Sequence, residues 1–250
     1  MVIGVLGGTG QSGTAVTAEL ARRGHRAIVL ARGRPAAGEH RRVDVVSGEG
    51  LAGAMDGLEA LAEVLDGDEA VLVGGVRRAL AAARAAGVGH VVSLSAAGAG
   101  RVPLGYYRIK AAQEALVRES GVPFSIVRAA QFHPFVAGRF AAAARRGVLP
   151  LLRAPIEPVA VAEVAAGLAD RVEAGPDGAL TELAGPRVER LDALARSWAR
   201  IEGVRRLPLP VPAVGAVLRG LRSGGLLAEA PIRGRVAFAD WLADPRAAAG

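Results

Sequence analysis

Cysteine is absent from this chain of 250 residues. Without thiols the protein forms neither disulfides nor a thiolate nucleophile, and a zinc site built from cysteines is excluded. The four histidines are scattered along the chain and show no metal-ligand spacing. The sequence therefore predicts no metal centre.

Long apolar runs are also missing. Apolar residues make up 51% of the chain, but charged residues or prolines interrupt each long run. A membrane-spanning helix needs about 20 consecutive apolar residues. A strand pattern begins already at Val2, which leaves no room for a signal peptide. We therefore expect a cytoplasmic protein that does not enter a membrane.

Aromatic residues are scarce, at 4% of the chain, which is too few for a platform that stacks nucleobases. The formal net charge of +7 and a pI near 11.1 would suit an anionic polymer, but the arginines form no basic block. Arginines on solvated faces explain this charge without nucleic acid. The expected partner is a small-molecule substrate, and the expected state is a monomer or a homodimer.

The start of the chain carries the clearest motif. Val2 to Leu6 is a short β-branched run, typical of a parallel strand buried on both faces. A helix is expected from Thr14 to Arg22, closed by Gly24. The residues that connect strand and helix are Gly7, Gly8, Thr9, Gly10, Gln11, Ser12 and Gly13.

The glycines at positions 7, 10 and 13 have the spacing GxxGxxG. Such glycines permit a tight turn, let the backbone approach a pyrophosphate, and allow close packing of helix on strand. The free amides and the dipole of the following helix favour an anionic phosphate. The stretch 7–13 thus predicts a dinucleotide site, and a glycine turn that binds nothing is the alternative.

A second strand is expected from His25 to Ala31, and Arg32 follows it directly. In dinucleotide-binding folds an acidic residue here binds a ribose 2′-hydroxyl, whereas an arginine accommodates a 2′-phosphate. Arg32 therefore predicts NADP(H) rather than NAD(H), unless it is an ordinary loop arginine. Asp44, in a third predicted strand over 42–46, is a candidate to meet the adenine edge or to cap a helix.

Strands and helices alternate along the first part of the chain. Further strands are expected at 58–65, 90–95 and 122–128, and helices at 51–55, 69–86 and 106–119. This alternation predicts an α/β fold with a doubly wound parallel sheet of the Rossmann type. Residues 1–150 are expected to form the NAD(P)-binding domain, and 151–250 a small C-terminal substrate region packed on the same core.

Hydroxyl groups and the single lysine gather near the fifth predicted strand. Ser93 and Ser95 lie at its carboxyl end, where open α/β sheets bind ligands. Tyr106 and Lys110 are four residues apart and share a face of the next helix, with Tyr107 close by. Because arginine fills every other basic position, this lysine indicates a site that needs a compact ammonium. The alternative is that the two side chains anchor the helix to the sheet.

Several segments together resemble the atypical short-chain dehydrogenase/reductase superfamily, and within it the NmrA-like NAD(P)-binding proteins. The resemblance is carried by residues 7–13, 105–114, 128–133 and 234–242. It implies a Rossmann domain with a small C-terminal substrate region. It also implies a Tyr-xxx-Lys pair beside the nicotinamide, which Tyr106 and Lys110 match.

The resemblance implies roles for single residues. Tyr106 supplies a proton, with Tyr107 as the alternative, and Lys110 holds the nicotinamide ribose and tunes the tyrosine. Ser95, or else Ser93, polarises the substrate carbonyl. A phenol that titrates near pH 10 becomes a usable acid when an ammonium lies close. The superfamily's frequent catalytic asparagine has no counterpart, because the chain contains no asparagine.

The expected function is NADPH-dependent transfer of hydride to a carbonyl or activated double bond of a small organic substrate. Two alternatives stay open, since many NmrA-like proteins bind dinucleotide without turnover. One is a redox sensor that reports to a protein partner, and the other is a non-redox isomerase or cyclase on the same fold. His133 is expected to line a pocket or the core rather than to catalyse.

Overall fold

The computed structural model describes residues 1–212 and 214–244. The chain divides into two compact units. Unit 1 comprises Met1–Ser95, Arg108–Arg128 and Val161–Thr181, and unit 2 comprises Ala96–Tyr107, Ala129–Ala160 and Glu182–Gly250. The units therefore differ from the predicted halves 1–150 and 151–250, whose last residues, 245–250, lie outside the described part. A role of unit 2 in substrate binding stays a prediction.

An eight-stranded sheet has the order β12-β9-β6-β5-β4-β1-β2-β3. Its strands are β1 (Val2–Leu6), β2 (Arg26–Ala31), β3 (Glu39–Arg42), β4 (Ala60–Glu63), β5 (His90–Ala96), β6 (Phe124–Ala129), β9 (Leu180–Ala184) and β12 (Ile232–Arg233). The pairs β1–β2, β1–β4, β2–β3, β4–β5 and β9–β12 are parallel. The run from β3 to β6 has the strand order of dinucleotide-binding folds, with its reversal between β1 and β4. The predicted doubly wound α/β fold is confirmed.

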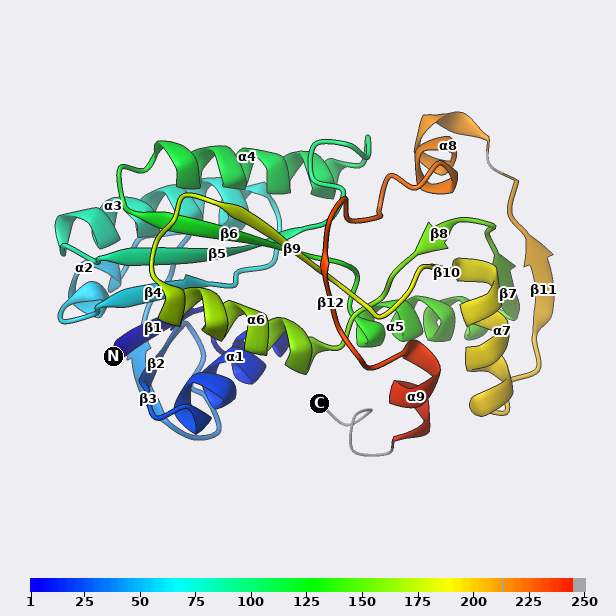
Figure 1. The fold of residues 1–250 in the computed structure, drawn as a ribbon, viewed down its shortest axis with the longest axis horizontal. Helices are drawn as coiled ribbons and strands as arrows, with labels where there is room; N and C mark the ends of the chain where they lie inside the picture. The colour runs from blue at the N-terminus through cyan, green and yellow to red at the C-terminus, as the bar shows by residue number, and fades with distance from the viewer. Residues whose placement is uncertain (213, 245–250) are drawn as a thin grey trace. The chain divides into compact units, whose positions relative to one another are not determined.

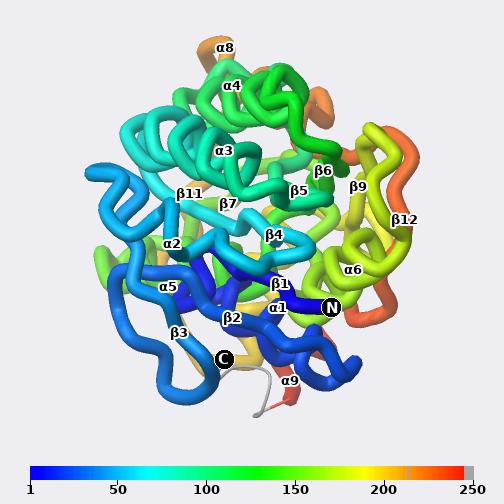
Figure 2. Tube along the Cα trace, turned by 90° about the vertical axis from the view of Figure 1, so that its left-hand side faces the viewer, coloured from blue at the N-terminus to red at the C-terminus, as the bar shows by residue number. Residues whose placement is uncertain are grey.

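Helices cover both faces of the sheet in unit 1. One face carries α2 (Leu51–Met55), α3 (Val76–Ala85) and α4 (Gly105–Glu119), and the other carries α1 (Gln11–Arg22) and α6 (Val161–Ala174) (Figure 1). Figure 2 shows β5, β4, β1 and β2 following one another between these helix layers. The strand side chains alternate into both layers, which explains their nearly continuous apolar sequences.

The third strand begins earlier than predicted. It spans Glu39–Arg42 instead of 42–46 and pairs with β2. Val43 and Val45 are buried but lie in a loop, because the Asp44 carboxylate accepts the amide of Val46 at 2.8 Å and closes a turn. Asp44 therefore does not cap a helix, and its contact with an adenine edge stays a prediction.

The predicted helix over 69–86 is in two parts. It starts as a π-helical turn, η1 (Ala70–Gly75), and continues as α3. Gly74 and Gly75 lower the helix propensity at this junction. A Cβ on Gly75 would lie 2.8 Å from a methyl carbon of Val45, so the helix approaches its neighbour closely here.

Unit 2 contains four helices among its described residues: α5 (His133–Ala144), α7 (Leu191–Ile201), α8 (Gly215–Arg222) and α9 (Phe238–Ala243). Strand β7 (Val148–Leu151) pairs in parallel with β11 (Leu207–Pro210), and β8 (Pro155–Ile156) pairs antiparallel with β10 (Glu189–Arg190). An aromatic core joins α5, α7 and α9 through Phe140, Trp198, Phe238 and Trp241. Across residues 1–212 and 214–244, no helix combines the length and apolar character that crossing a membrane requires.

Candidate functional site

The glycine stretch 7–13 forms the turn between β1 and α1, and two of its glycines are required by geometry. Gly7 has a φ of +87°, in the left-handed region that favours glycine. A Cβ on Gly13 would lie 2.1 Å from the carbonyl oxygen of Gly7. Only glycine therefore lets α1 start so close to the turn.

Helix α1 begins at Gln11, inside the glycine stretch and earlier than the predicted Thr14. Gln11, Ser12 and Gly13 thus form its first turn, whose amides have no acceptor within the helix. Gly10 precedes the helix without a capping side chain, and the first turn has no acidic residue. Thr9, Gly10 and Gln11 are exposed. The backbone amides and the helix dipole therefore favour an anion at this turn, as a pyrophosphate requires.

A basic hollow of about 600 Å³ lies beyond the carboxyl end of β2. Its lining residues are Arg32, Arg34, Gly38, Glu39, His40 and Arg42. The one lining carboxylate, Glu39, accepts hydrogen bonds from Arg26 at 2.9 and 3.0 Å, which lower its pKa. Within the described residues, the guanidinium groups of Arg32 and Arg34 have no such partner. Guanidinium groups around a hollow suit the oxygens of a phosphate.

Lys110 lies on α4 with 3% of its surface exposed. Its Nζ donates to the carbonyl oxygens of Leu65 and Leu94, each at 3.2 Å. Burial lowers the pKa of this ammonium, while the carboxylates of Glu63 and Asp66 oppose part of the effect. The lysine is thus held between the carboxyl ends of β4 and β5, the edge where open α/β sheets bind ligands.

Glu63, the last residue of β4, is a fully buried carboxylate beside this lysine. It accepts the Ser93 hydroxyl at 2.6 Å, the Leu65 amide at 3.0 Å and the side-chain amide of Gln113. Glu63 therefore fixes the loop whose carbonyl group holds Lys110. Sequence reasoning missed this role, since a glutamate in the apolar run 58–65 predicts only a poor strand.

A second buried carboxylate, Glu114 on α4, binds Ser95. The Ser95 hydroxyl donates to Glu114 at 2.7 Å, and Arg128 donates two hydrogen bonds to it at 2.7 and 2.9 Å. Burial acts to raise the pKa of Glu114, but the hydrogen bonds from Arg128 and Ser95 outweigh it and lower the pKa. While its proton points to Glu114, Ser95 cannot donate to a substrate carbonyl. The geometry thus opposes the role predicted for Ser95, and Glu63 engages Ser93 in the same way.

The two tyrosines at the start of α4 have different surroundings within unit 2. Tyr106 is 41% exposed, whereas Tyr107 is 8% exposed and packs with Val102 and Leu226. The Tyr107 hydroxyl accepts the side-chain amide of Gln131 at 3.3 Å, and burial raises its pKa. Of the two candidate acids, Tyr106 is the more exposed residue.

His133 belongs to the core of unit 2. It is fully buried, its Nε2 lies 3.0 Å from the carbonyl oxygen of Val236, and its ring packs against Phe238 and Trp241. This position agrees with the predicted core histidine. Over residues 1–212 and 214–244, no group of three histidine, aspartate or glutamate side chains is arranged to hold a metal ion.

Comparison with protein families gives one match that covers most of the chain. A family model described as NAD(P)H-binding matches residues 7–171. This span contains the glycine turn, Arg32 and Lys110. A search of curated protein sequences finds no match.

Solved structures with the same fold include two reductases and one epimerase. The NADPH-dependent quinone oxidoreductase of Escherichia coli, complexed with NADPH, is 22% identical with a TM-score of 0.81, covering 97% of this chain and 99% of that one. The triphenylmethane reductase of Citrobacter sp., complexed with NADP(H), is 21% identical with a TM-score of 0.76, covering 92% and 93%. A nucleoside-diphosphate-sugar epimerase of Staphylococcus aureus is 17% identical with a TM-score of 0.80, covering 98% and 100%. At identities this low, the structural likeness shows a shared fold alone.

Proposed function

The chain belongs to the NAD(P)H-binding family, and on this premise we propose that it is an NADPH-dependent oxidoreductase. Its substrate is a small organic molecule that receives hydride at a carbonyl or an activated double bond. The observation that carries the proposal is the pairing of the glycine turn with the arginine hollow at the end of β2. The turn suits any dinucleotide, whereas the arginines suit the one that carries a 2′-phosphate.

The residues of unit 1 fit this cofactor. The first turn of α1, with Gly7, Gly10 and Gly13 shaping its approach, holds the pyrophosphate. Arg32 binds the 2′-phosphate, and Arg34 and Arg42 line the same hollow. A charge-assisted hydrogen bond contributes about 1.5–3 kcal/mol, so Arg32 alone accounts for a preference of roughly tenfold to a hundredfold.

The reaction needs a hydride and a proton. NADPH, held by the glycine turn and by Arg32, would supply the hydride for the electrophilic carbon of the substrate. Tyr106 donates its phenolic proton to the oxygen of a carbonyl substrate, and Lys110, four residues along α4, favours the resulting phenolate by its charge. Lys110 also orients the nicotinamide ribose. Ser95 acts through Glu114, as a positioning residue.

The proposal is supported by the fold shared with the quinone oxidoreductase and the triphenylmethane reductase, whose structures hold NADPH and NADP(H). These two relatives also suggest the first substrates to try, namely quinones and triphenylmethane dyes. Aldehydes and ketones complete a panel in which consumption of NADPH is followed by its absorbance. Binding of NADPH without turnover on the whole panel would favour a sensor instead.

The decisive experiment titrates the cofactor-free protein with NADPH, NADH, NADP and NAD by calorimetry, beside Arg32→Ala. We expect NADPH to bind at least about tenfold more tightly than NADH, and the variant to lose most of that difference. Arg22→Ala is the control, because Arg22 is a mostly exposed arginine on α1 paired with Glu19. Equal affinities for NADPH and NADH in the unaltered protein would refute the assignment of Arg32.

A further inference from the structure

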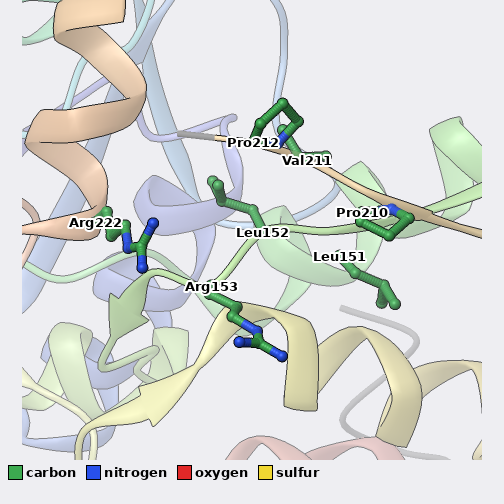
Figure 3. Close-up of a pocket in the computed structure, with 7 residues that line it drawn as sticks. All are labelled: Leu151, Leu152, Arg153, Pro210, Val211, Pro212 and Arg222. Atoms are coloured by element: carbon green, nitrogen blue, oxygen red, sulfur yellow. The ribbon is translucent and has the colours of Figure 1, made fainter. Parts of the chain in front are cut away.

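A cavity of about 240 Å³ lies entirely within unit 2 (Figure 3). It is lined by residues 151–153, by residues 210–212 and by Arg222 of α8. Five of these side chains are apolar, and the other two are the arginines Arg153 and Arg222. The cavity therefore combines apolar walls with two arginine side chains.

The apolar walls are fixed by backbone pairing. Strands β7 and β11 run in parallel with Pro210 opposite Leu151, and the Val211 amide donates to the Leu151 carbonyl oxygen at 3.2 Å. The rings of Pro210 and Pro212 fix the φ angles of these two residues, so this part of the wall has little conformational freedom. A wall that is ordered before a ligand arrives reduces the entropy cost of binding.

The arginines of this cavity have no competing acid. No hydrogen bond or ion pair joins the guanidinium of Arg153 or Arg222 to another residue in the described part of the chain. The two stretches that supply the cavity, 129–156 and 203–228, contain eight arginines and no aspartate or glutamate. The whole chain has a formal net charge of +7, so the rest of the chain outside these two stretches carries no net positive charge.

We propose that this cavity binds a small organic carboxylate with a compact apolar body. The planar guanidinium pairs with a carboxylate through two parallel hydrogen bonds, while leucine, valine and proline side chains remove the apolar body from water. The volume of about 240 Å³ lies below the roughly 300–1,000 Å³ of sites for drug-sized ligands, which limits the size of that body. This inference goes beyond the proposed function and does not depend on it.

The test uses 2-naphthoate and its neutral counterpart 2-naphthalenemethanol, titrated calorimetrically into the full-length protein. We expect the carboxylate to bind at least about tenfold more tightly than the alcohol. Arg153→Gln and Arg222→Gln should each weaken naphthoate about tenfold, and Arg153→Lys should weaken it less. Arg219→Gln is the matched control, since Arg219 is exposed on the same helix and does not line the cavity.

Equal binding of acid and alcohol, unchanged affinity in both glutamine variants, or no binding of naphthoate would each overturn the proposal. If inorganic phosphate bound as tightly as naphthoate, the claim that the cavity recognises an apolar body would be wrong. Thermal unfolding of each variant checks that the fold is intact. NADPH titration of the same variants should give unaltered affinity, so failure here is separate from failure of the dinucleotide assignment.

Discussion

Ser93 and Ser95 show that a residue type and its place on a strand do not reveal its hydrogen-bond partner. Ser95 lies near the carboxyl end of β5, where a hydroxyl is well placed to meet a ligand, and Ser93 lies at the middle of the strand. Each instead donates to a buried glutamate, Ser93 to Glu63 and Ser95 to Glu114. The sequence shows a hydroxyl at a strand end, but its acceptor comes from a distant segment and depends on the packing of α4 and β4.

The tyrosine pair gives the clearest prediction for a single residue. Tyr106→Phe removes only the hydroxyl proposed as the proton donor, so turnover should fall by at least about a hundredfold. The NADPH affinity should stay unchanged, because the glycine turn and Arg32 are untouched. Steady-state kinetics on an active substrate of the panel, beside an NADPH titration, measures both quantities.

Tyr107→Phe is the matched control. Its hydroxyl is buried and bonded to Gln131, so we expect turnover to persist and stability to fall by about 1 kcal/mol. Loss of turnover in Tyr107→Phe but not in Tyr106→Phe would exchange the roles of the two residues.

Helix α4 is held on the sheet by charge as well as by apolar packing. Glu114 of α4 accepts hydrogen bonds from Ser95 of β5 and Arg128 of β6, and it is only 2% exposed. Glu114→Gln leaves the Arg128 guanidinium without its carboxylate, which should cost about 3 kcal/mol of the free energy of unfolding at neutral pH. Urea unfolding measures this, with Glu119→Gln, an exposed residue of the same helix, changing it by less than about 0.5 kcal/mol.

The same pair predicts a dependence on pH. The pKa of Glu114 in the folded protein lies below its ordinary value of 4.5. The ionised carboxylate therefore adds stability that is complete above this ordinary value and is lost as the pH falls through the lower folded value. The stability difference between the unaltered protein and Glu114→Gln should thus shrink below pH 4.5. A difference that stays constant down to acid pH would contradict the assignment.

Elements with strong local signals were predictable, and those set by tertiary contacts were not. Strand β1 and helix α2 have the bounds that the sequence predicts, because a β-branched run and turn glycines delimit them. The predicted position of strand β3 was wrong, because Val43 and Val45 have the alternating apolar pattern of a strand but are buried in a loop. The π-helical turn η1 was missed because its glycines accommodate a neighbour that the sequence does not identify.

For the whole molecule, the doubly wound parallel sheet followed from the alternation of strands and helices, and the glycine turn from its place between the first strand and the first helix. The resemblance to the atypical short-chain dehydrogenase/reductase superfamily agrees with the NAD(P)H-binding family match. The division into interleaved units was not predictable, because it depends on contacts between segments far apart in the sequence. The cavity of unit 2 was likewise not predictable from the sequence, because it depends on the pairing of β7 with β11.

Cofactor binding should stabilise the protein as a whole. A ligand that binds only the folded state adds about 2.7 kcal/mol at a hundred times its Kd. We therefore expect NADPH at that concentration to raise the stability against urea by about this amount. Arg32→Ala at the same NADPH concentration should lose at least about 1.4 kcal/mol of the gain, the equivalent of a tenfold weaker affinity. Identical unfolding curves with and without NADPH would contradict the dinucleotide site.

The interleaving of the two units also constrains how such a protein can change over evolution. The chain passes from one unit to the other five times. A single recombination point between two related genes therefore cannot exchange one unit and leave the other intact. New specificity in unit 2 has to arise by substitution within its own segments, or by insertion at their loops, while the dinucleotide-binding segments between them are inherited unchanged.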